Sequence, residues 1–189
     1  DANRLRALRG ERGADTPSPD WDLRYLLHSV QPIEEMANEI FAAFAQHISA
    51  PLGDVALWLE PGRYIANKGV HLLLQVADIK GGEIAITDGG TNLLGWERLE
   101  TEHCPLVNIS HPALTQQRCR IYGSLCTPHD LWGYAYYGTH LEVGDILLLP
   151  AQGSYVQTLA QRFIKPICQT VYLSEKGDIK QVERAEILT

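Results

Sequence analysis

Glu60 and Arg63 flank a Pro-Gly turn in the run "WLEPGRY", residues 58–64. A carboxylate and a guanidinium that follow a buried apolar strand can be presented together at its carboxyl end, where ligands bind in α/β folds. The alternative is a surface strand–turn–strand in which the two charges form a solvated ion pair. Residue types alone leave both interpretations open.

Two further runs end in groups that could do chemistry. In "AITDGGTNLL", residues 85–94, Asp88 is followed by two glycines, which permit close backbone approach or positive φ. In "YGSLCTPHDLWG", residues 122–133, Cys126 precedes a histidine and an aspartate and could be a reactive thiol. The alternatives are a simple turn for the first run and a small buried hydrophobic side chain for the cysteine.

A fourth run, "LPAQGSYVQTLAQRF", covers residues 149–163 and predicts a strand, a Gly-Ser turn and a short helix. Backbone N–H groups at the turn and helix start could hold an anion, with the Tyr155 hydroxyl as an added donor. An ordinary strand-to-helix connection would have the same residue pattern, so this run by itself does not distinguish an anion site from a simple connection.

One long amphipathic helix precedes these runs, over residues 32–48. Pro32 and two following glutamates favour its start, and Gly53 lies just beyond its end. Its apolar positions recur at the i, i+3, i+4, i+7 spacing of a single helix face: Ile33, Met36, Ala37, Ile40, Phe41, Phe44 and Ile48.

Strand-like runs dominate the remainder of the chain. Turn residues at 80–82 and 176–178 predict two hairpin connections. One helix followed by many strands predicts an α+β fold, in which the end of a (β/α) barrel leads into an all-β domain. The strands are expected at 55–60, 64–79, 83–87, 105–110, 119–126, 145–150, 169–174 and from 179 onward.

The pattern divides the chain into three parts. Residues 1–30 are expected to be an irregular segment with short helical pieces, because charged residues there give way to Gly, Pro, Ser and Asp. Residues 31–63 would be the last helix and strand of an α/β barrel, and residues 64–189 the β-domain. The chain begins with Asp1 and its only methionine is Met36, which suggests a processed, split or partial product.

Composition narrows the classes of function. Of the 189 residues, 45% are hydrophobic and 21% charged, which is typical of a soluble globular protein. The net charge is −7 and the lysines are scattered, so nucleic-acid binding is not expected. No run approaches the roughly 20 apolar residues of a membrane-spanning helix. We therefore expect a cytoplasmic protein without membrane association.

The four cysteines show neither C-x-x-C spacing nor the density of a disulfide scaffold, so free thiols are expected. His103, Cys104 and His111 could in principle hold a metal ion. Their spacing matches no usual zinc pattern, and they lie in a strand-like run. The sequence therefore predicts no metal site.

Taken together and in order, these motifs resemble the second half of the fold-type III pyridoxal 5'-phosphate (PLP) decarboxylases that act on ornithine, arginine or diaminopimelate. The resemblance runs from about residue 31 to residue 174. It rests on "EPGRY", "DGG", the G-x-x-C-x-x-x-D pattern at 123–130, "LEVGD" and a G-x-Y before a helix.

The resemblance implies PLP as cofactor and gives roles to residues. Glu60 would pair with the pyridine nitrogen, while Gly62, Arg63 and Tyr155 would hold the phosphate. A carboxylate keeps the ring nitrogen protonated, so that the ring can accept the electrons left when the carboxylate of the substrate departs, and an arginine fork suits a phosphate dianion.

The resemblance also assigns residues to the substrate. Asp88 would face its distal end, and Cys126 would reach across a dimer to protonate the carbanion carbon. In the polyamine-type members an acidic residue follows the cysteine, whereas this chain has Thr127. We therefore expect a substrate whose far end is not a simple terminal ammonium, with His129 or Asp130 shaping that pocket.

The family's Schiff-base lysine, its cofactor-stacking histidine and its Gly-rich phosphate loop have no counterpart in this sequence. An active enzyme would need the rest of the barrel, as a missing part of the same polypeptide or as a partner chain. The family forms head-to-tail dimers with shared active sites, so a homodimer acting on an amino acid is expected, in polyamine or lysine biosynthesis.

Two other functions remain possible. The chain could be a non-catalytic relative that binds a phosphate-bearing ligand or regulates a full-length decarboxylase, or a β-rich interaction domain that keeps only the scaffold. Retention of Glu60, Arg63, Cys126 and Tyr155 together favours the enzyme, because turns and strand ends accept many other residues. A racemase relative would share barrel and cofactor, but the cysteine-and-aspartate motif favours decarboxylation.

Overall fold

The computed structural model describes residues 32–95 and 106–183, with the side chains of Arg63 and Glu183 excepted. The predicted irregular segment 1–30 lies outside the described residues. Those that are described fall into two compact units, which we call the helical unit (residues 32–61) and the barrel unit (residues 62–95 and 106–183). Each is described by itself.

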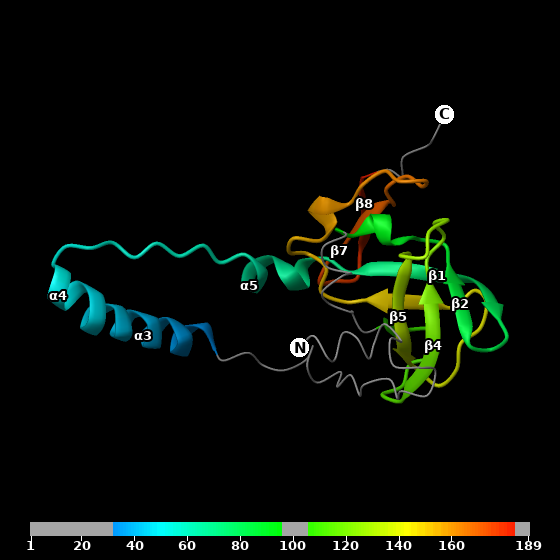
Figure 1. Ribbon diagram of the computed structural model, residues 1–189, viewed down its shortest axis with the longest axis horizontal. Helices are drawn as coiled ribbons and strands as arrows, with labels where there is room; N and C mark the ends of the chain where they lie inside the picture. Colours follow the sequence, from blue (N-terminus) through cyan, green and yellow to red (C-terminus); the bar gives the residue numbers. More distant parts are fainter. Residues whose placement is uncertain (1–31, 96–105, 184–189) are drawn as a thin grey trace. The chain divides into compact units, whose positions relative to one another are not determined.

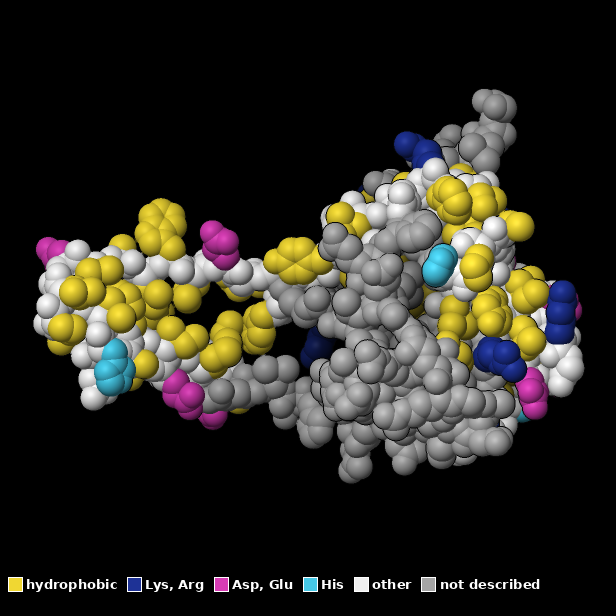
Figure 2. Space-filling view, in the orientation of Figure 1, with side chains coloured by type: hydrophobic (Ala, Val, Ile, Leu, Met, Phe, Trp, Pro, Cys, Tyr) yellow, Lys and Arg dark blue, Asp and Glu magenta, His cyan; other side chains and the backbone are white. Residues whose placement is uncertain are grey.

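The helical unit confirms the predicted amphipathic helix. It comprises α3 (Ile33–Phe44), a π-helical turn η1 (Ala45–Ser49) and α4 (Ala50–Leu52). Pro32 stands at the N-cap, Glu34 and Glu35 occupy the first turn, and Gly53 ends the helix with φ of 79°. None of its described side chains is buried, and Figure 2 shows hydrophobic side chains on its surface.

The barrel unit is built on six strands that close on themselves in the order β1-β2-β4-β5-β3-β6 (Figure 1). Closure leaves no unpaired strand edge in this sheet. The strands are β1 (Leu72–Lys80), β2 (Ile84–Thr87), β3 (Leu106–Asn108), β4 (Gln116–Tyr122), β5 (Leu131–Tyr137) and β6 (Ile146–Leu149).

Two of the strand pairs are parallel although the others are antiparallel. β2 runs parallel to β4, with Ile84 opposite Arg120 and Ile86 opposite Tyr122. β3 likewise runs parallel to β5, with Leu106 opposite Tyr136. Because parallel neighbours end at the same edge of a sheet, the segments that follow β2 and β4 emerge side by side.

The barrel interior is filled by alternate residues of the strands, as the pleat requires. In β1 Leu72, Leu74 and Val76 point inward while the residues between them are exposed. Trp132 of β5 is completely buried and donates its indole N–H to Thr87 Oγ1 at 3.0 Å. The other large interior side chains include Leu94, Leu106, Ile121, Leu147 and Leu149.

Both predicted hairpin turns are confirmed. Gly81 and Gly82 join β1 to β2 with φ of 59° and 72°, a left-handed conformation that favours glycine. Gly177 (φ 86°) lies in the turn between β7 (Thr170–Leu173) and β8 (Ile179–Glu183), which form a separate two-stranded sheet.

Several expected strand positions are wrong. Residues 55–60 form no strand, and the strand expected at 64–79 begins only at β1, because α5 (Arg63–Ala66) and the 3-10 turn η2 (Asn67–Gly69) come first. The amides of Ile65 and Ala66 both donate to the Gly62 carbonyl, which closes a helical turn there.

The motif regions also differ from expectation. The strand expected at 119–126 is β4, which begins at Gln116 and ends at Tyr122, so Cys126 lies in a loop. β5 was not expected at all. The short helix expected before residue 163 is a single 3-10 turn, η4 (Gln157–Leu159). None of the helices in the described ranges has both the length and the apolar character needed to cross a bilayer.

Candidate functional site

The loop that carries Cys126 lies beside the turn that carries Asp88. Both follow strands of the parallel pair β2 and β4, so the common polarity of the strands brings the two loops to one edge of the barrel. The Ser124 hydroxyl donates to the Asp88 carbonyl at 2.8 Å. Gly90 has no room for a Cβ because the Leu125 side chain packs against it. The spacing of the two motifs along the sequence gives no sign of this neighbourhood.

Asp130 is the residue that holds these two loops together. Its side chain is buried, with Oδ1 accepting the Thr91 amide at 2.7 Å and Oδ2 accepting the Leu125 amide at 2.5 Å. Gly123 is required opposite it, because a Cβ there would collide with the carboxylate. Asp130 therefore positions the Cys126 loop from within the barrel, and a direct contact with substrate stays a prediction.

Asp88 is itself tied to the barrel. Its Oδ1 accepts the Gln75 amide at 2.8 Å, and its own amide donates to the Gln75 carbonyl at 2.9 Å. The Lys165 ammonium donates to the Asp88 carbonyl at 3.2 Å. One carboxylate oxygen thus takes part in the β1–β2 pairing. Contact between Asp88 and the distal end of the substrate stays a prediction.

The outward side of the same loop is open to solvent. Cys126 and His129 are exposed and Thr127 is half-buried, with Thr127 Oγ1 near the His129 amide at 3.4 Å. Cys119 provides the contrast, because it is buried in the barrel and burial raises the pKa of its thiol. Of these two thiols, Cys126 is the one that an external reactant can approach.

Tyr155 belongs to a second cluster, formed where the segment after β6 meets the start of the barrel unit. Its φ of 59° is left-handed, and its hydroxyl lies so close to Gly62 that a Cβ there would collide with it. The Gln152 amide donates to the Val70 carbonyl at 2.8 Å, which fixes the approach of the two segments. Gly62 and Tyr155 therefore lie together, and a phosphate-binding role for them and for Arg63 stays a prediction.

Glu60, the expected partner of the ring nitrogen, belongs to the helical unit and is exposed there. Its relation to Gly62 and Tyr155 stays a prediction. His103 and Cys104 of the metal set considered from the sequence lie outside the described residues, whereas His111 is described and is half-buried.

Sequence reasoning missed the supports of the Cys126 loop. The Ser124 hydroxyl joins the two loops and the Thr87–Trp132 hydrogen bond joins β2 to β5, and neither stood out from residue type. The run of aromatic residues in "LWGYAYY" was the available signal for β5, because Trp and Tyr are enriched in strands.

Comparison with known proteins finds a family model that is similar to the barrel unit. Residues 63–153 match the family model described as pyridoxal-dependent decarboxylase, C-terminal sheet domain. This part of the chain is therefore similar to the C-terminal sheet domain of that family. The matched residues include Arg63, Asp88 and the whole 123–130 loop, whereas Glu60 and Tyr155 lie just outside them.

Individual decarboxylases are also similar to this chain. A diaminopimelate decarboxylase from Methanothermobacter thermautotrophicus is 25% identical over 158 residues, which are 82% of this chain and 37% of the relative. The crystal structure of diaminopimelate decarboxylase from Helicobacter pylori complexed with L-lysine has a TM-score of 0.69 at 22% identity, over 87% of this chain and 40% of that one.

A third relative is more distant. Arginine decarboxylase of Paramecium bursaria Chlorella virus, bound to agmatine, has a TM-score of 0.56 at 21% identity, over 68% of this chain and 36% of that one. These likenesses confirm the predicted α+β fold with its β-domain. The chain spans about 40% or less of the length of these relatives.

Proposed function

We propose that the chain is the carboxy-terminal portion of a PLP-dependent decarboxylase that removes the α-carboxylate of an amino acid to give an amine. The main support is that the matched decarboxylase domain includes the complete G-x-x-C-x-x-x-D motif, held at one edge of the barrel beside Asp88. A scaffold without this chemistry would have no need of an exposed cysteine on a loop anchored by a buried carboxylate.

The residues of the barrel unit fit the phosphate end of PLP. Gly62 exposes its backbone where the Tyr155 hydroxyl lies, and a side chain at that position would exclude the hydroxyl. Tyr155 would donate to a phosphate oxygen, and Arg63 would supply the compensating charge. Glu60 would keep the pyridine nitrogen protonated. When bound, PLP supplies the electron sink that makes the loss of CO₂ possible.

Cys126 would then act as the proton donor. After CO₂ has left, a proton delivered to the α-carbon of the substrate gives the amine, whereas a proton delivered elsewhere gives an aldehyde and an aminated cofactor. A positioned acid is therefore needed. The Asp130 contacts to Leu125 and Thr91 would fix where the thiol points.

The substrate would be an amino acid of the amino-dicarboxylic type, such as diaminopimelate. Thr127 replaces the acid that would bind a terminal ammonium, and His129, two residues further along, offers an exposed imidazole. Two of the similar proteins above are diaminopimelate decarboxylases, and one of them is complexed with L-lysine, which is what diaminopimelate becomes when it loses one carboxylate.

The complete site would include groups that are not in this sequence. The lysine that holds PLP covalently, and the barrel strands that flank residues 55–60, would come from the same polypeptide or from a partner chain. A dimer with shared sites would bring the Cys126 of one subunit to the PLP of the other. Several apolar side chains of the helical unit are exposed, among them Ile40 and Phe41. Other elements of the proposed α/β barrel would cover them.

The decisive experiment measures cofactor and substrate together. The natural protein is reduced with borohydride and its mass and PLP absorbance are recorded, and CO₂ release is assayed with diaminopimelate, ornithine, arginine and lysine. We expect a reduced PLP adduct and preferential turnover of diaminopimelate. Efficient turnover of ornithine would contradict the substrate assignment, and a 21.1 kDa species that never binds PLP would contradict the enzyme assignment.

A change of Cys126 to Ala tests the proton donor. In the assembled enzyme PLP should remain bound, while product shifts from amine toward aldehyde because the positioned acid is lost. Cys168→Ala is the matched control, since Cys168 is also exposed. The amine-to-aldehyde ratio is measured by chromatography, and an unchanged ratio in the Cys126→Ala enzyme rules out this role.

A further inference from the structure

Two histidines and two carboxylates converge at the end of the barrel unit opposite the Cys126 loop. His111 follows β3, and the others, His140, Glu142 and Asp145, lie between β5 and β6. The Cys126 loop precedes β5 and this cluster follows it, so a seven-residue strand, about 20 Å long, separates them. The cluster is therefore no part of the proposed PLP site.

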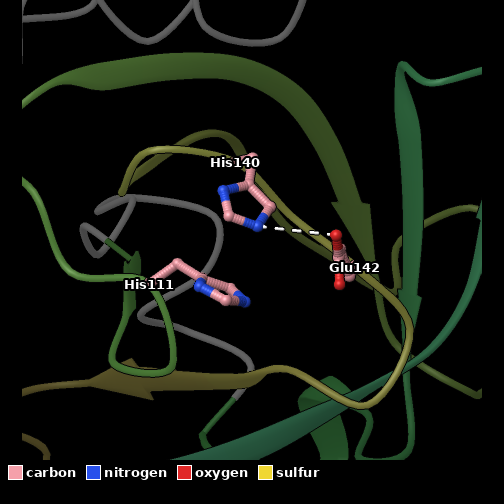
Figure 3. Close-up of side chains that lie close together, drawn as sticks. All are labelled: His111, His140 and Glu142. Carbon is pink, nitrogen blue, oxygen red and sulfur yellow. Dashed lines mark ion pairs between the residues drawn. The ribbon is translucent and has the colours of Figure 1, made fainter.

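Figure 3 shows the imidazoles of His111 and His140 against each other, with the carboxylate of Glu142 facing them. The ring centroids are 3.9 Å apart, and one ligand atom from each of the three residues lies within 4.8 Å of the others. Asp145 completes the group, because its Oδ1 is 3.3 Å from His111 Nε2. A fourth possible donor atom therefore lies beside the group of three.

Two of the donor spacings are longer than a strong charged hydrogen bond and match the edge of a zinc tetrahedron. His111 Nε2 to Asp145 Oδ1 is 3.3 Å, and His140 Nε2 to Glu142 Oε1 is 3.5 Å. A charged N–H···O bond spans about 2.7–2.9 Å. Zinc bonds of about 2.0–2.2 Å in a tetrahedron place neighbouring donors about 3.3–3.5 Å apart. The side chains of His140 and Glu142 are exposed, so they can rotate and bring their donor atoms closer to the donor atom of His111.

Contacts behind the donors orient them. Buried Asn108 donates its Nδ2 to the His140 carbonyl and to Asp145 Oδ2, both at 2.8 Å, and its Oδ1 accepts the His111 amide at 3.2 Å. The Thr139 hydroxyl lies 3.0 Å from His140 Nδ1. In the tautomer in which Nδ1–H donates a hydrogen bond to this hydroxyl, Nε2 carries the free lone pair, which is the usual arrangement of a metal-binding histidine.

We propose that His111, His140, Glu142 and Asp145 bind a zinc ion. Two neutral imidazoles and two carboxylates compensate its double charge, and Asp145 is only 7% exposed at its side chain, so one ligand is fixed by the fold. The ion joins the segment after β3 to the β5–β6 connection. The site differs from the sequence expectation of no metal, because its ligands come from two segments that only the barrel brings together.

The test is a zinc titration of the full chain without added PLP, by calorimetry and by competition with a chromophoric chelator. We expect one ion per chain with a micromolar or tighter dissociation constant, weakened about 100-fold or more by His111→Ala and by His140→Ala. Thr139→Val, which removes only the outer contact, should weaken it about tenfold. His47→Ala is the matched control, since this exposed histidine lies in the helical unit.

Unchanged affinity in the double variant His111→Ala/His140→Ala overturns the site, as does the absence of binding by the unmodified chain at micromolar zinc. X-ray absorption of the zinc-loaded unmodified chain provides a measurement that needs no variant. Two imidazole ligands with oxygen donors support the assignment, and one imidazole or none refutes it.

Discussion

The barrel unit and the helical unit differ in where their apolar side chains are. In the barrel unit a closed sheet buries a contiguous core that includes Leu74, Ile121 and Trp132. In the helical unit α3 has an equally regular apolar stripe, yet Phe41 is 51% exposed and no side chain is buried. A sheet that closes on itself supplies its own cover, whereas an amphipathic helix needs another element to cover its stripe.

The largest expected effect follows from removing a core side chain. Trp132→Ala should lower the free energy of unfolding of the full chain by about 3–5 kcal/mol, because it empties a fully buried position and removes the hydrogen bond to Thr87. The matched change Phe41→Ala should cost less than about 1 kcal/mol. Denaturant unfolding measures both.

A further prediction applies if the remainder of the proposed α/β barrel is supplied. Phe41→Ala should then lower the free energy of unfolding by nearly as much as a core substitution, because other elements would bury the apolar stripe of α3. Equal costs for Trp132→Ala and Phe41→Ala in this chain alone would contradict the difference between the two units.

The next effect concerns the loop anchored by Asp130. Asp130→Ala should lower the free energy of unfolding by about 2 kcal/mol, because it leaves the buried amides of Thr91 and Leu125 without their hydrogen-bond acceptor. His129→Ala, one residue away but exposed, should change stability by less than about 0.5 kcal/mol. Chemical denaturation gives the energies, and amide hydrogen exchange should show faster exchange at Thr91 and Leu125 only in Asp130→Ala. Unaltered exchange at both amides would mean that Asp130 does not hold the loop.

The smallest expected effect is on the pH dependence of the free energy of unfolding, and it concerns groups that are buried in the barrel unit. Burial raises the pKa of Cys119 above its ordinary value of 9.0, and burial likewise raises the pKa of Tyr136. Above about pH 9 the unfolded chain loses these protons before the folded one does, so stability falls as pH rises. Cys119→Ala should make that fall shallower, as measured by unfolding at a series of alkaline pH values. An identical slope in the variant would show that the Cys119 thiol has the same pKa in both states.

Local patterns in the sequence predicted one helix and several of the strands and turns. The stripe at residues 32–48 predicts α3, and the glycines at 81, 82 and 177 predict turns that the structure confirms. The errors occur where tertiary contacts decide: residues 64–69 look like a strand but turn helical, with the 152–153 backbone bonding to Val70 and Asn67. Local periodicity has no information about such a neighbour.

The candidate site divides in the same way. Residue types indicated Cys126, Asp88 and Tyr155, because a thiol, a carboxylate and a phenol at strand ends have evident chemistry. That Asp130 faces inward, and that Ser124 joins the two loops, follows from the parallel pairing of β2 with β4, which is a contact between residues some 36 positions apart. Pairing partners over such separations are chosen by the closure of the whole barrel.

The sequence by itself determined the balance of one helix and many strands, the turns, and the set of reactive side chains, because these depend on residues within a few positions of one another. Only the tertiary structure decided which strands are parallel, which carboxylates face the interior, and that His111 meets His140. These depend on barrel closure, in which each strand must satisfy its backbone hydrogen bonds with two neighbours at once.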